Sequence, residues 1–245
     1  MSRWFAFAAM VVLATHCTAD DKSGFLDRTL KGPDGVEAKY VVFVPHKLEA
    51  GKKPPVILFL HGAFRIGTDG KRHTTTALAP AIRKREQDFP FVVVMPQAQK
   101  LEKDAIETWY PGHPEGDRAL AMLDAAMKEF DGDPQRIYLT GYSMGGFGTW
   151  KMADAFPKKW AAIVPICGGG ETTWAANIKD IPCWCFHGEK DSMLPVARSR
   201  DMIAALKAAG AKPKYDEYPG VNHDCWDRAY GTDALYTWLL EQKLK

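Results

Sequence analysis

The sequence predicts an α/β protein built on a mostly parallel, twisted sheet with helices on both faces. Short apolar runs typical of strands alternate with stretches in which apolar residues recur at helical spacing. The runs are almost continuously apolar, as in strands that helices bury from both sides. No internal repeat or low-complexity linker interrupts the alternation. We therefore expect functional groups on loops at the carboxyl ends of the strands.

Seven runs predict strands and three stretches predict helices. The helical stretches are Ala119–Phe130, Phe147–Phe156 and Met202–Ala209, the last of which stops at Gly210. About fourteen residues separate the fifth and sixth predicted strands, too few for a helical cap domain, so we expect an open cleft. The predicted strands are Tyr40–Val44, Val56–Leu60, Phe91–Met95, Ile137–Thr140, Ala162–Ile166, Trp184–Phe186 and Tyr215–Tyr218.

Residues 1–19 have the pattern of a secretory signal peptide. Arg3 supplies a positive start, Trp4–Ala14 is an apolar run too short to span a membrane, and Cys17–Ala19 provides a small-residue cleavage site. A lipid anchor on Cys17 is the alternative, but a histidine precedes it where a small residue is needed. The pattern indicates a secreted or periplasmic protein.

Length and charge limit the remaining chain. Residues 20–245 are enough for one sizeable catalytic domain and short for two. The formal net charge is +2, and no basic stripe is present, so neither nucleic acid nor a membrane surface is an expected partner. The sequence does not determine the oligomeric state.

Four cysteines follow the predicted leader. An oxidising compartment permits a disulfide, and four thiols allow three full pairings that the sequence cannot rank. Two of them alternate within an apolar run, where cysteine behaves as a small buried hydrophobic residue. We expect no metal and no cofactor, because two well-spaced pairs of metal ligands are missing. The four are Cys167, Cys183, Cys185 and Cys225.

The run Gly141-Tyr142-Ser143-Met144-Gly145-Gly146 predicts a sharp turn from a strand into a helix, with Ser143 at its tip. Glycine is needed because a Cβ atom at position 141 or 145 would collide with neighbouring backbone. We expect Ser143 to be a catalytic nucleophile and the amide of Met144 to be one oxyanion donor. The alternative is a tight glycine turn with an idle serine.

A serine nucleophile needs a base, and His223 is the histidine placed to provide it. It follows the last predicted strand through a Pro-Gly turn and precedes a C-terminal helix. Asp191 lies on the loop after the preceding strand and is expected to orient the imidazole, which gives the order serine, acid, histidine. Glu189 and Asp224 are the alternative acids.

The second oxyanion donor is expected on the turn that follows Val56–Leu60. Ala63 is the first choice, and Phe64 is the alternative. His61 and His187 both lie in His-Gly pairs that end strands, where histidine more often braces a loop by hydrogen bonding.

Three aromatic residues are candidate substrate contacts. Trp109 and Tyr110 form a pair on a long loop, which would suit a sugar or aryl ring if both are exposed. Trp174 lies on the loop between the fifth and sixth predicted strands. The alternative is that the rings pack beneath their own loops.

Taken together, these motifs resemble the α/β-hydrolase superfamily. The likeness is greatest to the secreted esterase branch that contains feruloyl esterases, acetylxylan esterases, polyhydroxyalkanoate depolymerases and prolyl-oligopeptidase-like predicted peptidases. Ala63-Phe64 departs from the pattern, since many relatives carry further glycine there. The motifs are Leu60-His61-Gly62, Asp133-Pro134-Gln135-Arg136-Ile137-Tyr138, Gly141–Gly146, His187-Gly188-Glu189-Lys190-Asp191 and Asn222-His223-Asp224.

The resemblance implies a serine carboxylesterase that forms an acyl-enzyme on Ser143. A cleft without a cap favours acyl groups of bulky or polysaccharide-linked esters, with a small-molecule or polymer-attached ester as the partner. Alternatives are a serine peptidase of prolyl-oligopeptidase-like type, a polyhydroxyalkanoate depolymerase, and a non-catalytic binding module that retains the fold.

Overall fold

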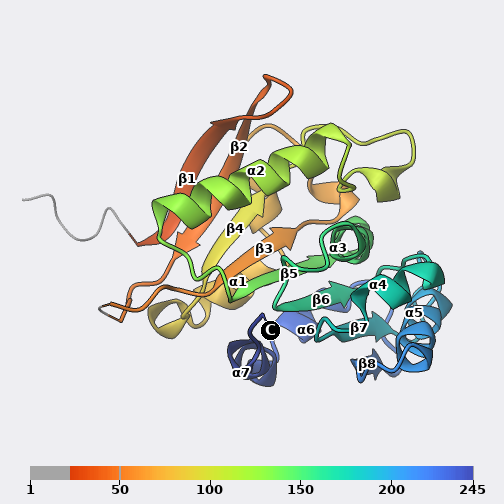
Figure 1. Ribbon diagram of the computed structural model, residues 1–245. Helices are drawn as coiled ribbons and strands as arrows, with labels where there is room; N and C mark the ends of the chain where they lie inside the picture. Colours follow the sequence, from red (N-terminus) through yellow and green to blue (C-terminus); the bar gives the residue numbers. More distant parts are fainter. Residues whose placement is uncertain (1–22, 50, 245) are drawn as a thin grey trace, which may run out of the picture.

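The computed structural model describes residues 23–49 and 51–244 (Figure 1). The leader predicted over residues 1–19 lies outside these ranges and stays a prediction. Within the described ranges, no helix is long and apolar enough to cross a membrane.

A single eight-stranded sheet forms the centre of the protein (Figure 1). Its strands are β1 Gly24–Lys31, β2 Glu37–Val44, β3 Val56–Leu60, β4 Val92–Pro96, β5 Ile137–Tyr142, β6 Ala162–Ile166, β7 Trp184–Gly188 and β8 Lys214–Tyr218. They lie in the order β1-β2-β4-β3-β5-β6-β7-β8. Strands β1, β2 and β4 pair in antiparallel fashion, and every pairing from β4 to β8 is parallel. The predicted mostly parallel sheet is confirmed.

All seven predicted strands are present, with bounds that differ by a few residues. The sequence pattern does not predict β1, whose residues alternate between partly buried and exposed along an edge of the sheet. Such a strand lacks the continuous apolar run that marks the buried strands, for example Val56–Leu60, in which every residue is buried. Strand β1 is held in the sheet by pairing with β2 over its whole length.

Helices cover both faces of the sheet, as predicted. One face carries α2 Pro114–Glu129, α3 Met144–Ala155, α4 Ala175–Ile178 and α5 Ala197–Ala208, and the other carries α1 Leu78–Arg83, α6 Trp226–Tyr230 and α7 Asp233–Glu241. The pleat of β3 shows this division, because Leu58 packs in the first cluster and Phe59 in the second. In Figure 1, α2 runs across the near side of the sheet.

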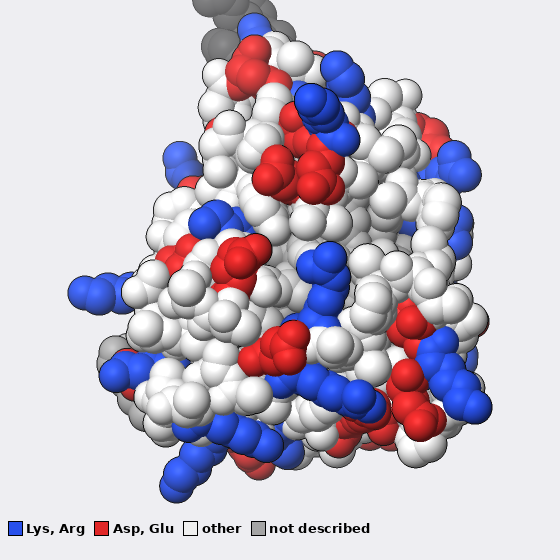
Figure 2. Space-filling model, turned by 90° about the vertical axis from the view of Figure 1, so that its right-hand side faces the viewer, with Lys and Arg blue, Asp and Glu red and all other residues white. Residues whose placement is uncertain are grey.

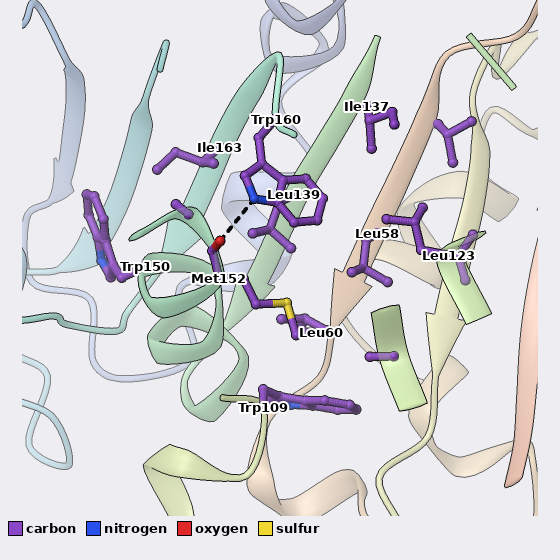
Figure 3. Close-up of a cluster of buried hydrophobic side chains, with 14 of the residues drawn as sticks. Leu58, Leu60, Trp109, Leu123, Ile137, Leu139, Trp150, Met152, Trp160 and Ile163 are labelled. Carbon is purple, nitrogen blue, oxygen red and sulfur yellow. Dashed lines mark hydrogen bonds between the residues drawn. The ribbon is translucent and has the colours of Figure 1, made fainter. Parts of the chain in front are cut away.

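Large aromatic side chains pack around α3 (Figure 3). Trp150 and Trp160 are both fully buried. The Trp160 indole N–H donates to the carbonyl of Met152 at 3.1 Å, so the ring enters the core without leaving that polar atom unpaired. Packing of this kind fixes α3, and therefore the turn at its N-terminus, against β5.

The loops that carry the three candidate catalytic residues follow β5, β7 and β8, three strands within one run of parallel neighbours. Their carboxyl ends therefore lie at the same edge of the sheet. Between β6 and β7 the chain forms a 3₁₀ helix, Thr172–Trp174, and the single-turn helix α4. The expected absence of a cap domain stays a prediction.

Candidate active site

The turn after β5 has the strained geometry that its glycines predict. Ser143 has φ 55° and ψ −121°, a positive φ that side-chain-bearing residues rarely adopt. A Cβ atom at Gly141 would lie 2.4 Å from the carbonyl oxygen of Gly145, and one at Gly145 would lie 1.9 Å from the carbonyl oxygen of Leu60. These clashes confirm the steric reason for both glycines.

The backbone around Ser143 is tied down on both sides. Its amide donates to the carbonyl of Ile166 at 3.0 Å, and its own carbonyl accepts from Gly146 at 2.8 Å. Helix α3 starts at the next residue, Met144. The surrounding structure therefore holds a conformation that costs about 1–3 kcal/mol, and the side chain lines a cavity.

Ser143, His223 and Asp191 lie within hydrogen-bonding reach of one another. The Oγ atom of Ser143 lies 2.9 Å from Nε2 of His223, and Nδ1 of His223 lies 2.6 Å from Oδ2 of Asp191. An ionised carboxylate only accepts, so Nδ1 carries the ring proton and the bare Nε2 faces the serine hydroxyl. The structure thus brings together the three residues named from sequence order, while their catalytic roles stay a prediction.

The alternative acids are placed differently. Glu189 accepts from the backbone amide of Gly220 at 2.7 Å, and Asp224 is an exposed residue on the wall of the cavity. The contact to Nδ1 of His223 is made by Asp191, which has its other oxygen, Oδ1, bound to two backbone amides of its own loop.

Asn222 connects the two loops that carry the acid and the histidine. Its side-chain oxygen accepts from the amide of Ser192 at 2.9 Å and from the amide of His223 at 2.8 Å. Sequence reasoning gave this residue no role of its own. Its position directly before the histidine is the only signal the sequence carries, because an asparagine commonly binds the backbone next to it.

The turn after β3 holds the amide of Ala63, whose expected role as an oxyanion donor stays a prediction. The Nδ1 of His61 donates to the carbonyl of Gly62 at 2.8 Å, and its Nε2 accepts from the amide of Ala98 at 3.0 Å. Complete burial lowers the pKa of His61 to about 3, so the ring is neutral. In a trans peptide the N–H points opposite to the carbonyl, so this brace sets the direction of the Ala63 amide.

The amides of Ala63 and Met144 are both available to a ligand. Neither takes part in a backbone hydrogen bond outside helices and strands in the described residues. Met144 is the first residue of α3, where the helix leaves its N–H groups without intrahelical partners. Both residues neighbour the cavity that Ser143 enters, and Ala63 is part of its lining.

A cavity of about 310 Å³ opens beside Ser143 and His223. Two of its lining side chains are large, apolar and exposed: Phe64 at 72% and Met193 at 55%. They come from the loops after β3 and β7, which lie on opposite sides of β5 in the sheet. The full lining is Gly62, Ala63, Phe64, Arg65, Tyr142, Ser143, Ser192, Met193, Asn222, His223, Asp224 and Trp226.

The expectation of an exposed aromatic pair is wrong for Trp109. This residue is 1% exposed, packs in the core, and donates its indole N–H to the carbonyl of His61 at 2.9 Å. It supports the turn after β3 that holds Ala63. Tyr110 and Trp174 are partly buried and meet edge to face with ring centroids 6.3 Å apart, outside the lining of the cavity. Burial raises the pKa of Tyr110 to about 12.

The four cysteines of the described residues are all free and buried. Burial raises the pKa of the Cys183 thiol well above its ordinary value, as expected for a small core residue. In the same part of the chain, no group of three or more His, Cys, Asp or Glu side chains is arranged to hold a metal ion. On the face drawn in Figure 2, acidic and basic side chains are interspersed among uncharged ones.

The parallel sheet, the helices on both faces and the serine turn after β5 define a protein of the α/β-hydrolase fold. The chain belongs to the Dienelactone hydrolase family, whose sequence model matches residues 40–230. The superfamily resemblance drawn from the motifs is confirmed.

Known esterases are similar to this chain. It is 27% identical over 157 residues to the bifunctional acetylxylan esterase/xylanase XynS20E of Neocallimastix patriciarum. The aligned residues make up 60% of this chain and 21% of that enzyme. It is 25% identical to feruloyl esterase B of Thermothelomyces thermophilus over 162 residues, 64% of this chain and 52% of that one. The chain thus spans a fifth to a half of these relatives. The crystal structure of a thermostable esterase superposes with a TM-score of 0.75 at 35% identity, covering 92% of this chain and 64% of the other.

Proposed function

We propose that this protein is a serine carboxylesterase that forms an acyl-enzyme on Ser143. The observation that carries the proposal is the hydrogen-bonded line from Ser143 Oγ through the imidazole of His223 to Asp191. Membership of a hydrolase family and likeness to esterases support it.

In the proposed first half-reaction, Ser143 Oγ attacks the ester carbonyl carbon while its proton passes to Nε2 of His223. The imidazolium that forms is stabilised by Asp191, which already accepts from Nδ1. The carbonyl oxygen becomes an oxyanion and accepts from the amides of Ala63 and Met144, with further support from the positive end of α3. The C–O bond to the alcohol then breaks, and the alcohol leaves with the proton from His223.

In the second half-reaction, water takes the place of the alcohol. The Nε2 of His223 accepts a proton from that water as its oxygen attacks the acyl carbon. The same two amides hold the new oxyanion. The bond between the acyl carbon and Ser143 Oγ then breaks, the serine regains its proton, and the carboxylic acid is released.

The walls of the cavity favour esters with an apolar or aryl part. Phe64 and Met193 expose apolar surface to solvent on either side of the serine, and surface of this kind is stabilised when a ligand covers it. We propose acyl groups of bulky or polysaccharide-linked esters as substrates, in line with the names of the acetylxylan and feruloyl esterases to which the chain is similar.

Ser143→Ala is the primary test of the mechanism. We expect it to abolish turnover of 4-nitrophenyl acetate and labelling by a fluorophosphonate probe, because the attacking oxygen is removed. Asp191→Asn should fold normally and lose about 10⁴-fold in kcat, because the imidazole is no longer held in the right tautomer. Circular dichroism checks folding, and mass spectrometry locates the labelled residue.

Ser23→Ala is the matched control, since Ser23 binds His46 far from the cavity. It should keep the activity and the label of the unaltered protein. Turnover that persists in Ser143→Ala would refute the serine mechanism. A rate on a matched anilide that equals the rate on the ester would favour the peptidase alternative.

We also propose that the mature protein is exported after removal of residues 1–19. The apolar run and the small-residue cleavage site support this proposal. N-terminal sequencing of protein recovered outside the cytoplasm should begin at Asp20, and a chain that retains Met1 would refute it.

A further inference from the structure

A second histidine contacts the carboxylate of Asp191. The Nε2 atom of His187 lies 3.1 Å from Oδ2 of Asp191, the same oxygen that accepts from His223. The side chains of His187 and Asp191 are both fully buried. The proposed mechanism gives His187 no part, and the sequence pattern indicates only that it braces a loop.

The neighbours of His187 determine which of its nitrogens carries the proton. Nε2 also lies 3.0 Å from the carbonyl oxygen of Leu194, and both that carbonyl and an ionised carboxylate only accept. Nε2 must therefore be a donor. On the other side of the ring, Nδ1 lies 2.7 Å from the hydroxyl oxygen of Ser199, which also lies 3.2 Å from the carbonyl oxygen of Gly168. In a neutral ring with its proton on Nε2, Nδ1 is an acceptor and takes the hydroxyl proton at the shorter of the two distances. Burial lowers the pKa of His187, which favours this neutral form.

The carboxylate of Asp191 is consequently surrounded by donors on every side the structure describes. Oδ1 accepts from the amides of Met193 at 2.9 Å and Leu194 at 2.8 Å, while Oδ2 accepts from the two imidazoles. The two amides hold Oδ1, and without His187 the one described donor left on Oδ2 would be the His223 ring that the carboxylate itself has to orient. The His187 contact fixes the second oxygen at the point where Nδ1–H of His223 meets it.

We propose that His187 is a positioning residue for the triad: its Nε2–H holds Asp191 in the orientation that keeps the imidazole of His223 aligned with Ser143. This inference rests on the proposed esterase function. Hydrogen bonds from buried donors to a charged acceptor are among the stronger ones in proteins, so loss of this one should be measurable in the rate of the chemical step.

Nuclear magnetic resonance tests the contact without reference to activity. In protein labelled with ¹⁵N-histidine, we expect His187 to show a protonated Nε2 and a bare Nδ1, with no titration between pH 6 and 8. A protonated Nδ1, or a ring that takes up a second proton in this range, would overturn the proposal.

Kinetics of two substitutions tests the consequence. His187→Leu keeps the apolar volume and removes the donor, and should lower kcat by about 10- to 100-fold with KM within about twofold of its starting value. His187→Gln retains a side-chain N–H that can reach Asp191, and should recover most of the loss. Ser199→Ala should give a smaller loss, because it leaves the Nε2–H of His187 on Asp191 and removes a hydroxyl that contacts Nδ1, the carbonyl of Gly168 and the thiol of Cys185.

His73→Leu is the matched control for removal of a buried histidine. Like His187, His73 is 0% exposed and donates from Nε2 to a backbone carbonyl, that of Met95 at 2.9 Å, but it does not contact Asp191. It should lose stability and keep kcat. Equal losses in the two leucine variants, or equal losses in His187→Leu and His187→Gln, would refute a positioning role.

The two proposals fail in different ways. If the protein is not a serine hydrolase, the unaltered chain will neither turn over esters nor take the fluorophosphonate label, whatever the spectra of His187 show. If His187 does not position the triad, the unaltered chain will be active and His187→Leu will be as active.

Discussion

Two histidines of the site, His61 and His223, have different hydrogen-bond partners. His61 is neutral and sets the peptide before Ala63, whereas His223 has one nitrogen on Asp191 and the other facing Ser143. The same residue type thus serves as a brace in one place and as a candidate base in another. What separates the two roles is exposure: the His223 ring borders the cavity, and the His61 ring does not.

A prediction at this scale concerns Phe64, whose ring is the most exposed apolar group of the cavity. Phe64→Ser should lower kcat/KM about tenfold for a feruloyl ester and less than about threefold for an acetyl ester, because only the larger acyl group covers the ring. Steady-state kinetics on the two substrates measures the ratio.

Phe156→Ser is the control for the loss of an exposed phenylalanine. Phe156 is 39% exposed and lies beside Pro157 and Leu244, away from the residues that line the cavity at Ser143. It should leave both rates unchanged. An equal loss on acetyl and feruloyl esters in Phe64→Ser would contradict a role in selecting the acyl group.

At the scale of elements, the junction between β5 and α3 is the feature on which the site depends. The chain leaves β5 through a turn that requires glycine at positions 141 and 145, and α3 then packs against β5 and β6. The close approach of Gly145 to the carbonyl of Leu60 also brings β3 and the turn after it next to the serine. The close contact between Gly145 and Leu60 therefore positions both Ser143 and the turn after β3.

Gly145→Ala tests this junction. The added Cβ would lie 1.9 Å from the carbonyl oxygen of Leu60, so backbone must shift, and we expect a loss of several kcal/mol in the free energy of unfolding. Gly210→Ala is the control, with φ +90° and open space around it, and should cost only about 1 kcal/mol. Urea unfolding measures both, and similar losses in the two variants would contradict a steric need for glycine at position 145.

At the scale of the whole molecule, the sequence predicts most of the sheet and the residues that meet at its edge. Buried parallel strands are apolar throughout, so their runs can be recognised in the sequence. The order of serine turn, acid and histidine can also be recognised without knowing how the side chains pack. The sequence does not predict β1, because this edge strand has mixed burial and no continuous apolar run. It does not predict the burial of Trp109 either, because an aromatic residue on a loop gives the same sequence pattern whether its ring faces solvent or the core. The sequence also does not predict the contact between His187 and Asp191, because this contact depends on where the chain turns after Asp191.

Two buried histidines make the stability of the fold depend on pH. Burial lowers the pKa of His73 to about 4 and that of His61 to about 3, whereas histidine in an unfolded chain titrates near 6.5. Below pH 6.5 the unfolded chain binds protons that the folded protein excludes, so stability is fully present above this pH and falls as the pH decreases toward 4. Each such histidine contributes a slope of about 1.4 kcal/mol per pH unit.

Urea unfolding of the unaltered protein and of His73→Leu between pH 5 and 6 measures this slope. The variant should be less stable near pH 7.5, because a buried carbonyl loses its donor, and its stability should fall less steeply with acid by about 1.4 kcal/mol per pH unit. Carboxylates such as Asp69, whose pKa its backbone donors lower to about 2, lose their contribution only below this window. Parallel slopes for the two proteins would mean that His73 is protonated in the folded state, which its burial and its single hydrogen bond make costly.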